Sequence, residues 1–362
     1  MIRVAFATTI SSLCGYHTRA QTAAAGRLVN RSLNTTSPRL TLADATLDAP
    51  TAAPAAADAR AATPVVSVIV PAKNAAAYIG ETIASALAQD GVAEVIVVDD
   101  GSTDDTITIV HAIHGPRLRL IRNDASGVSA ARNFGARNAR GDWLMFLDAD
   151  DRLRPDAVTT LLAAAKAAPR AVLVYGDYNT IDSAGRSIGR RDLLKGRLKP
   201  SGQVLERLAG GNFIVNGGIM LVRADAFRTT GGFDISLRYC EDWHCWCRLA
   251  ATGEFAYVPK LLLDYRLHTA NTMNAAVRTP QDFFPAVARV FGDELILGKL
   301  PSGAAARLRR AAEIHLVTYA ATQAVRFGRH RDALAYLGMV GRRSLKAVPR
   351  SAIKIALSYF GI

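Results

Sequence analysis

From residue 64 onward, short apolar runs alternate with segments of helical spacing, and this alternation restricts the fold more than any other feature. The runs are rich in β-branched residues, and the segments between them repeat apolar residues every three or four positions. One unit takes about 25 residues, the length of a strand, a helix and their loops. The pattern predicts β-α-β crossovers and a parallel sheet covered on both faces. Strands are expected at 65–70, 94–98, 118–121, 143–147, 171–175 and 261–265, and helices at 78–89, 104–113, 129–139 and 155–167.

Composition divides the chain of 362 residues into three parts. Residues 41–63 are largely Ala, Thr, Asp and Pro and lack the large side chains that would repay ordering, so we expect 1–63 to form a disordered tail. Residues 64–275 carry the alternating pattern of an α/β domain. Residues 276–362 lack strand signals and predict a basic helical region, with helices at 304–327, 331–340 and 342–359.

The positive charge is concentrated at the end of the chain. The formal net charge is +13, and from residue 301 onward 11 Lys and Arg face two acids, which gives 11 − 2 = +9. Recognition of nucleic acid is disfavoured because no interleaved aromatic pattern or nucleic-acid module accompanies this charge. The segment 342–362 suits either an amphipathic helix on anionic lipid or plain solvated helices, and the residues leave both open.

Other bulk features bear on the compartment. No run reaches the roughly 18 to 20 apolar residues of a spanning helix. Four cysteines are a poor disulfide framework for this length, so a reducing compartment is expected. The spacing of Cys240, Cys245 and Cys247 matches no common zinc site and favours buried thiols. We therefore expect a cytoplasmic protein, peripheral at the inner face of the cell membrane if it binds lipid, and leave open whether the N-terminus is a targeting segment.

Carboxylates follow two of the expected strands. Asp99 and Asp100 end one strand, and Asp148, Asp150 and Asp151 end another. Carboxylates this close raise one another's pKa unless a cation joins them, and a hard divalent ion with oxygen ligands would do so. Alternation along an extended backbone would turn Asp148 and Asp150 to one side. An acidic turn with Asp151 as a helix cap explains the second group equally well.

Three further positions carry two interpretations each. Asn74, after the first strand, is a natural N-cap for the next helix. The pair Glu241 and Asp242 suits a helix N-terminus, where acids complement the dipole, and the residues alone favour that interpretation over catalysis. Trp243 could stack against a sugar, although aromatic residues on a short helix more often belong to the core.

Together these motifs resemble the family 2 glycosyltransferases of GT-A fold. The resemblance covers roughly residues 64–270, and one departure is Lys73, where many members carry an aromatic residue. The motifs that carry it, in order, are Pro71-x-x-Asn74, Asp99-Asp100-Gly101-Ser102-Thr103-Asp104, Ala131-Arg132-Asn133 with Gly135, Asp148-x-Asp150-Asp151, Gly217-Gly218, Gly231-Gly232-Phe233-Asp234, Glu241-Asp242-Trp243 and Tyr265-Arg266-Leu267-His268.

The resemblance implies a role for each matched residue. Asp242 is expected to be the general base, with Glu241 orienting it, and Asp150 with Asp148 to hold Mg²⁺ or Mn²⁺. Gly217, Gly218 and Trp243 would meet the acceptor. The nucleotide sugar would contact Pro71, Ala72, Asn74, Asp99, Asp100, Arg132, Asp148, Arg266 and His268.

The expected activity is that of an inverting, metal-dependent glycosyltransferase. It would move a sugar, most naturally from a UDP-sugar, to a hydroxyl of a glycan or lipid-linked acceptor in cell-surface polysaccharide synthesis. A catalytically silent sugar-nucleotide-binding or scaffold protein is the alternative, against which the presence of Asp150 and Asp242 speaks. A nucleotidyltransferase is disfavoured because no Gly-rich phosphate loop follows the first strand.

Overall fold

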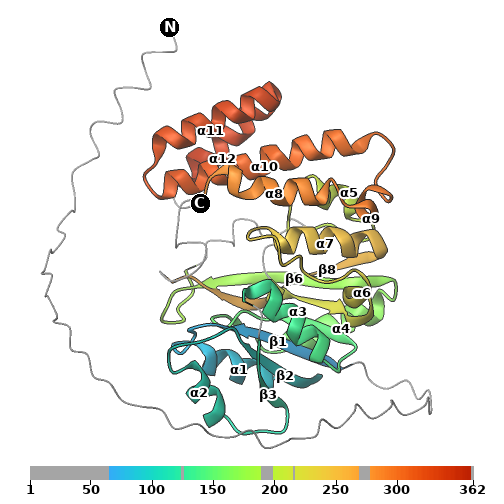
Figure 1. Ribbon diagram of the computed structural model, residues 1–362, viewed down its shortest axis with the longest axis vertical. Coiled ribbons are helices and arrows are strands. Elements are labelled where there is room, and N and C mark those ends of the chain that lie inside the picture. The colour runs from blue at the N-terminus through green and yellow to red at the C-terminus, as the bar shows by residue number, and fades with distance from the viewer. Residues whose placement is uncertain (1–64, 124–125, 189–198, 215–216, 269–277, 360–362) are drawn as a thin grey trace, which may run out of the picture. The chain divides into compact units, whose positions relative to one another are not determined.

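The computed structural model describes residues 65–123, 126–188, 199–214, 217–268 and 278–359. The expected disordered tail, 1–63, lies outside the described residues. Residues from 65 onward belong to one compact unit, drawn in Figure 1. Its centre is an eight-stranded sheet of order β3-β2-β1-β4-β7-β6-β8-β5. The strands are β1 (Val66–Ala72), β2 (Val92–Asp99), β3 (Leu118–Arg122), β4 (Trp143–Phe146), β5 (Arg152–Leu153), β6 (Ala171–Ile181), β7 (Met220–Arg223) and β8 (Glu254–Arg266).

The first half of the sheet confirms the alternation seen in the sequence. Strands β3, β2, β1 and β4 pair in parallel, and each expected strand and helix up to residue 167 is present within a few residues of its expected bounds. The connecting helices are α1 (Ile79–Leu87), α2 (Thr106–Ala112), α3 (Val128–Asn138) and α4 (Ala157–Ala167). Residues of β1 and β2 are almost wholly buried, as expected of strands covered on both faces.

The second half adds antiparallel strands, so the sheet is mixed, with four of its seven strand pairings parallel. β7 runs antiparallel to both β4 and β6, β6 pairs in parallel with β8, and β5 closes the edge antiparallel to β8. The sequence pattern missed β5, whose two residues carry no periodicity, and it also missed β7. An α/β sheet with flanking helices and a helical C-terminal region is nevertheless confirmed.

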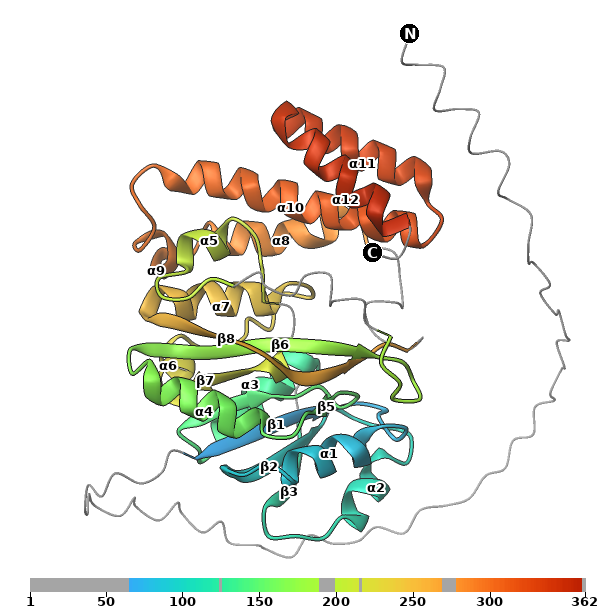
Figure 2. The ribbon, with the colours of Figure 1, turned by 180° about the vertical axis from the view of Figure 1, so that it is seen from behind.

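On one face of the second half of the sheet, helices are stacked in successive layers, as Figure 2 shows. α7 packs against β6, α8 packs on α7, and α10 packs on α8. Phe283 and Val287 of α8 and Leu308 and Leu316 of α10 belong to the same buried apolar cluster as the strands. These helices are α5 (Leu205–Ala209), α6 (Ala224–Thr229), α7 (Glu241–Thr252), α8 (Pro280–Val290), α9 (Glu294–Leu297), α10 (Ala304–Arg326), α11 (His330–Arg343) and α12 (Val348–Tyr359).

The expected C-terminal helices are confirmed, and α8 is an addition that the sequence pattern did not reveal. α8 begins with a capping box between Thr279 and Asp282, and it contains Pro285 in its interior. An internal proline is normally read as a helix boundary, which explains the omission. Within the described residues, none of the helices combines the length and the hydropathy needed to cross a bilayer.

Candidate active site

The loop after β1 is held against the loop after β2. Asn74 has a φ of 52°, a left-handed conformation that asparagine tolerates better than most residues. Its Oδ1 accepts a hydrogen bond of 2.7 Å from the backbone N–H of Thr103, and its own N–H donates to Ser102 Oγ at 3.1 Å. The prediction that Asn74 caps α1 is wrong, because α1 begins at Ile79. Asn74 instead fixes the spacing of two loops, next to Pro71 and Ala72 at the end of β1.

The two carboxylates after β2 brace the loops around them. Asp99 is buried and accepts from the backbone N–H groups of Gly101 and Ser102, at 3.3 and 3.0 Å. Asp100 accepts from the N–H of Gly127 at 3.0 Å, and Lys73 Nζ lies 3.9 Å away. Their position at the carboxyl end of a parallel strand is where ligands bind in such sheets.

The acids after β4 divide into one inward and two outward-facing residues. Asp151 is fully buried, and its Oδ1 accepts from the backbone N–H of Arg266 at 2.9 Å. Its predicted alternative role as a helix cap is therefore wrong, since α4 begins at Ala157 after Asp156. Asp148 and Asp150 keep side-chain exposures of 34% and 26%, so a ligand could reach both.

Asp150 carries a charge that the protein only partly compensates. Burial and the neighbouring Asp148 raise the pKa of Asp150 above its ordinary value, while His268 opposes this shift. His268 Nε2 lies 2.8 Å from Asp150 Oδ2, and the His268 ring packs beside Tyr78. His268 therefore lies beside the acidic group, and its contact with a nucleotide sugar stays a prediction.

Arg132 of α3 joins two acidic groups that are far apart in the sequence. Its Nη2 donates to Asp148 Oδ1 at 2.7 Å, and its Nη1 donates to Glu241 Oε1 at 3.3 Å. The guanidinium is almost fully buried, with 12% of the side chain exposed, and it lies over the ring of Phe233 at 5.4 Å from the ring centroid. The carboxylates after β4 and those at the start of α7 therefore lie on either side of one cation.

Two glycines allow α3 to hold Arg132 in this position. A Cβ on Gly135 would lie 2.5 Å from Ile69 Cγ2 of β1, so α3 and β1 approach too closely for a larger residue. Gly232 has a φ of 71°, and a Cβ there would lie 2.5 Å from Asn133 Oδ1. Asn133 in turn exchanges hydrogen bonds with the backbone of Phe233 at 2.7 and 2.9 Å.

Glu241 and Asp242 open α7, as the helix-terminus interpretation predicts. Asp242 Oδ1 accepts from the backbone N–H of Trp243 at 2.7 Å, and Oδ2 accepts from Asn212 Nδ2 at 3.3 Å. Burial and the charge of Glu241 raise the pKa of Asp242 to about 7, although Arg132 and these hydrogen bonds oppose the rise. A carboxyl group with this pKa can accept a proton near neutrality, so a position at the helix terminus does not exclude the predicted role as general base.

Burial contradicts two sequence predictions. Trp243 is 1% exposed, and its indole N–H donates to the carbonyl of Leu208 at 2.8 Å, so it belongs to the core and has no face for a sugar. Arg266 is 2% exposed, pairs with Glu81 and donates to the carbonyl of Asp150 at 2.8 Å. Arg266 therefore holds the backbone of the acidic loop by a hydrogen bond and is too buried to contact a diphosphate.

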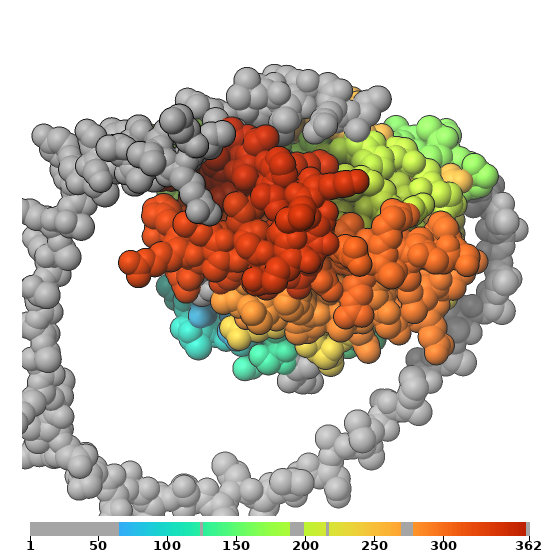
Figure 3. Space-filling view, turned by 90° about the horizontal axis from the view of Figure 1, so that it is seen from above, coloured from blue at the N-terminus to red at the C-terminus, as the bar shows by residue number. Residues whose placement is uncertain are grey.

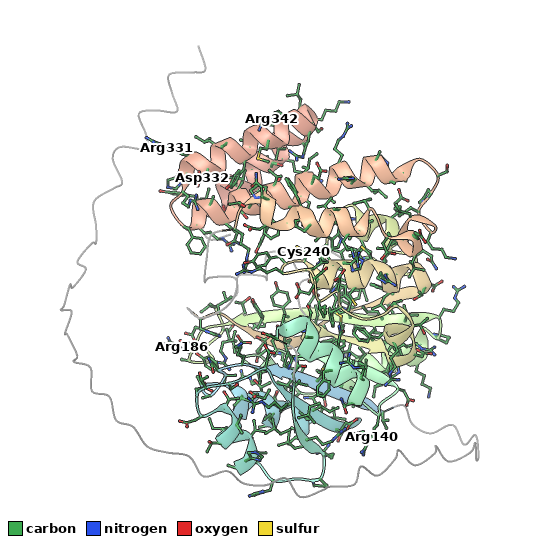
Figure 4. The ribbon with its side chains drawn as sticks, viewed as in Figure 1. Arg140, Arg186, Cys240, Arg331, Asp332 and Arg342 are labelled. Carbon is green, nitrogen blue, oxygen red and sulfur yellow. The ribbon has the colours of Figure 1, made fainter. Side chains whose placement is uncertain are left out.

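The remaining predictions fall at the edge of the described region. Gly217 and Gly218 begin a short 3₁₀ turn, and a Cβ on Gly217 would lie 2.8 Å from the carbonyl of Phe146. This close approach to β4 gives Gly217 a packing reason, and an acceptor role for either glycine stays a prediction. Cys245 and Cys247 are buried free thiols, as expected, and Cys240, marked in Figure 4, precedes α7.

Asn212 is a site residue that the sequence did not reveal. It lies 30 positions before Asp242, in the loop after α5, and its Oδ1 also accepts from the N–H of Ile214 at 3.0 Å. A lone asparagine in a loop carries no periodicity or motif, so only the fold could bring it to the carboxylate.

The carboxylates after β4 suit a divalent cation that takes some of its ligands from the protein and the others from a bound substrate. Among the described residues, no group of three or more His, Cys, Asp or Glu is arranged to hold a metal ion alone. Asp150 nevertheless offers an accessible carboxylate with a raised pKa, next to Asp148 and His268. Mg²⁺ commonly binds through one or two carboxylates and takes its other ligands from phosphates and water, which matches this donor set.

Comparison with known proteins places these residues in a sequence family. Residues 67–231 match the glycosyl transferase family 2 model. A chondroitin synthase of Escherichia coli is 32% identical over 58% of this chain and 30% of its own length. A succinoglycan biosynthesis protein of Rhizobium meliloti is 44% identical over 34% of this chain and 36% of its own. An uncharacterised glycosyltransferase of Rickettsia typhi is 29% identical over 61% and 70%.

Solved structures share the fold at lower sequence identity. The crystal structure of S. aureus TarS, residues 1–349, in complex with UDP-GlcNAc superposes with a TM-score of 0.55. The match covers 82% of this chain and 89% of that one, at 17% identity. At this identity the likeness establishes a common architecture only.

Proposed function

Because the chain belongs to the family 2 glycosyltransferases and has their GT-A fold, we propose that it is an inverting, metal-dependent transferase. The proposed reaction moves a sugar from a nucleotide-diphospho-sugar to a hydroxyl of a glycan or lipid-linked acceptor. The observation that carries the proposal is the bridge made by Arg132, which brings a cation-binding carboxylate group and a carboxyl group of pKa about 7 to one place. A diphosphate needs the first of these groups, and an attacking hydroxyl needs the second.

Asp242 is the proposed general base. It would take the proton of the acceptor hydroxyl as that oxygen attacks the anomeric carbon, and the bond from that carbon to the diphosphate oxygen would break on the opposite side. Displacement in one step inverts the anomeric centre. Asn212, the N–H of Trp243 and the charge of Glu241 orient the carboxyl group and set its pKa.

The donor is proposed to lie along the carboxyl ends of β1, β2 and β4. Pro71, Ala72 and Asp100 would line the nucleotide, and Asp148, Asp150 and His268 would face the diphosphate. A bound Mg²⁺ or Mn²⁺ would offset the charge that develops on the departing diphosphate. Asp150 is the residue proposed to hold it, because its carboxylate is accessible and lies next to Asp148 and His268.

A uridine diphosphate sugar is the proposed donor, and polysaccharide synthesis is the proposed context. The TarS structure contains UDP-GlcNAc, and named relatives are a chondroitin synthase, a hyaluronan synthase and a succinoglycan biosynthesis protein. All three names refer to polysaccharides, which supports a glycan acceptor. We also propose peripheral association with the inner face of the cell membrane, on the basis of the C-terminal charge.

Titration calorimetry with UDP-, GDP- and dTDP-sugars, each with and without Mn²⁺, tests the donor assignment. We expect one UDP-sugar to bind, with an affinity that falls when Mn²⁺ is chelated. Incubation of that donor with oligosaccharide acceptors, followed by NMR of the product, gives the anomeric configuration. Binding without transfer to any acceptor would instead support the silent scaffold, and retention of configuration would refute single-step displacement.

A further inference from the structure

α12 buries two of its serines and exposes two of its large apolar residues. Ser351 and Ser358 are buried, and Ser351 Oγ lies 2.8 Å from Thr318 Oγ1 of α10. Ile353 and Leu357, in contrast, are 61% and 42% exposed. An amphipathic helix that packs only against its own protein normally has the opposite arrangement. The exposed apolar side chains therefore belong to a surface, and Figure 3 looks down on the C-terminal helices that carry it.

Basic side chains accompany these apolar ones. Arg350, Ile353, Lys354 and Leu357 follow one another at spacings of three, one and three positions. At about 100° per residue, these spacings place the four side chains on one face of the helix. The short turn before α12 extends the pattern with Leu345, which is 81% exposed, and the exposed Lys346. We call these six residues the α12 face: Leu345, Lys346, Arg350, Ile353, Lys354 and Leu357.

A cation from a neighbouring helix, Arg207 of α5, reinforces this charge. His315 of α10 has its pKa lowered to about 4 by burial and by the charges of Lys354, Arg207 and Arg350. Burial together with Arg350 and Arg207 also lowers the pKa of Lys354. Every charged group that contributes to these two shifts is a cation. Arg207 of α5 with Arg350 and Lys354 of α12 thus forms an electropositive cluster around His315, and this cluster favours an anion.

We propose that the α12 face docks on the surface of an anionic lipid bilayer. The cations complement the lipid headgroups, and Ile353, Leu357 and Leu345 enter the boundary between headgroups and acyl chains. A soluble phosphate would use the cations but leave the apolar side chains in water, so a bilayer accounts for both features. The inference rests on the proposed membrane association and assigns that association to the α12 face.

The geometry also relates this surface to the acceptor. A Cβ on Gly211 would lie 3.1 Å from the His315 ring, so the loop after α5 passes directly against the electropositive cluster. The next residue, Asn212, donates to Asp242. A lipid-linked acceptor held at the α12 face would therefore lie beside the loop that reaches the proposed base.

Vesicle flotation of the full chain tests the proposal. We expect flotation with vesicles of phosphatidylcholine and phosphatidylglycerol, little with phosphatidylcholine alone, and release as salt is raised. Arg350→Glu with Lys354→Glu should lower the bound fraction more than about tenfold, and Ile353→Ser with Leu357→Ser about tenfold. The matched control, Arg331→Glu with Leu334→Ser on α11, changes an exposed cation and an exposed leucine elsewhere and should leave flotation unchanged; Figure 4 marks Arg331.

Several outcomes would overturn the proposal. Equal losses in the α11 control would remove the assignment to α12, and loss only in the charge variant would point to phosphate rather than to a bilayer. If the chain does not float, two results would identify a different occupant. Binding of a soluble polyphosphate would point to a phosphate ligand, and dimers that dissociate in the Ile353 and Leu357 variant would point to a second copy of this chain. UDP-sugar calorimetry on the same variants should be unchanged, so a failure of the proposed transferase function would be seen separately.

Discussion

The two acidic groups around Arg132 differ in how their charge is balanced. After β4, Asp148 pairs with Arg132 and Asp150 with His268, and both carboxylates remain accessible. At the start of α7, Arg132 binds Glu241, and Asp242 receives only neutral hydrogen-bond donors. We propose that the first group receives a cation and the second a proton. Similar residues thus differ in exposure and in the charges around them, although the same guanidinium contacts both groups.

The largest expected effect comes from removing the proton acceptor. Asp242→Asn should lower transfer at least about 10³-fold, because an amide cannot take the hydroxyl proton. Donor affinity should stay within about twofold, since the acids after β4 are untouched. Kinetics and calorimetry on the same preparation measure both quantities. If the variant kept its activity, Asp242 would not be the base and the contrast between the groups would be lost.

Removing the proposed cation ligand should mainly weaken donor binding, whereas removing the proposed base should mainly lower the rate of transfer. Asp150→Ala should weaken Mn²⁺-dependent donor binding by at least about tenfold, because the carboxylate proposed to hold the cation is gone. The pH dependence of residual transfer should keep its shape. Calorimetry in Mn²⁺ and in chelator measures the difference, and Asp156→Ala, at an exposed aspartate before α4, serves as the matched control. Equal affinities for wild type and Asp150→Ala would contradict the assignment.

The pH dependence of transfer should follow Asp242. A base works only when deprotonated, so kcat should fall by about tenfold per pH unit below an apparent pKa near 7 and level off above it. Rate measurements across this range, with donor and acceptor saturating, give the profile. An acidic limb near the ordinary carboxyl pKa would show that the enzyme does not use the raised pKa.

The smallest expected effect is on stability. The folded protein holds the Asp242 proton more tightly than the unfolded chain does, so the stabilisation is full in acid and is lost as pH rises through about 7. Asp242→Asn avoids this loss and should raise the free energy of unfolding by roughly 1 to 3 kcal/mol above that pH. Urea unfolding at mildly alkaline and acidic pH tests the prediction, and the difference should vanish in acid.

The sequence predicted the first half of the sheet because its strands are fully buried and its helices keep a clear period. It also singled out Asp148, Asp150, Glu241 and Asp242, and the structure brings these two acidic groups to either side of Arg132. It could not reveal that Arg132 joins them, because that contact spans 109 positions. Trp243 and Arg266 were misassigned for a related reason: motif position says nothing of burial, and both side chains are enclosed.

Gly135 and Gly232 set a limit on how freely this protein can vary. Neither touches a carboxylate, yet a single methyl group at either position would push α3 away from β1 or from the 231–233 turn, and Arg132 would move with it. Random mutagenesis should therefore yield folded but inactive variants at these two positions, outside the residues that any ligand contacts. The positions that do not tolerate substitution would then include, besides the residues of the site, two glycines that are required only because a side chain has no room there.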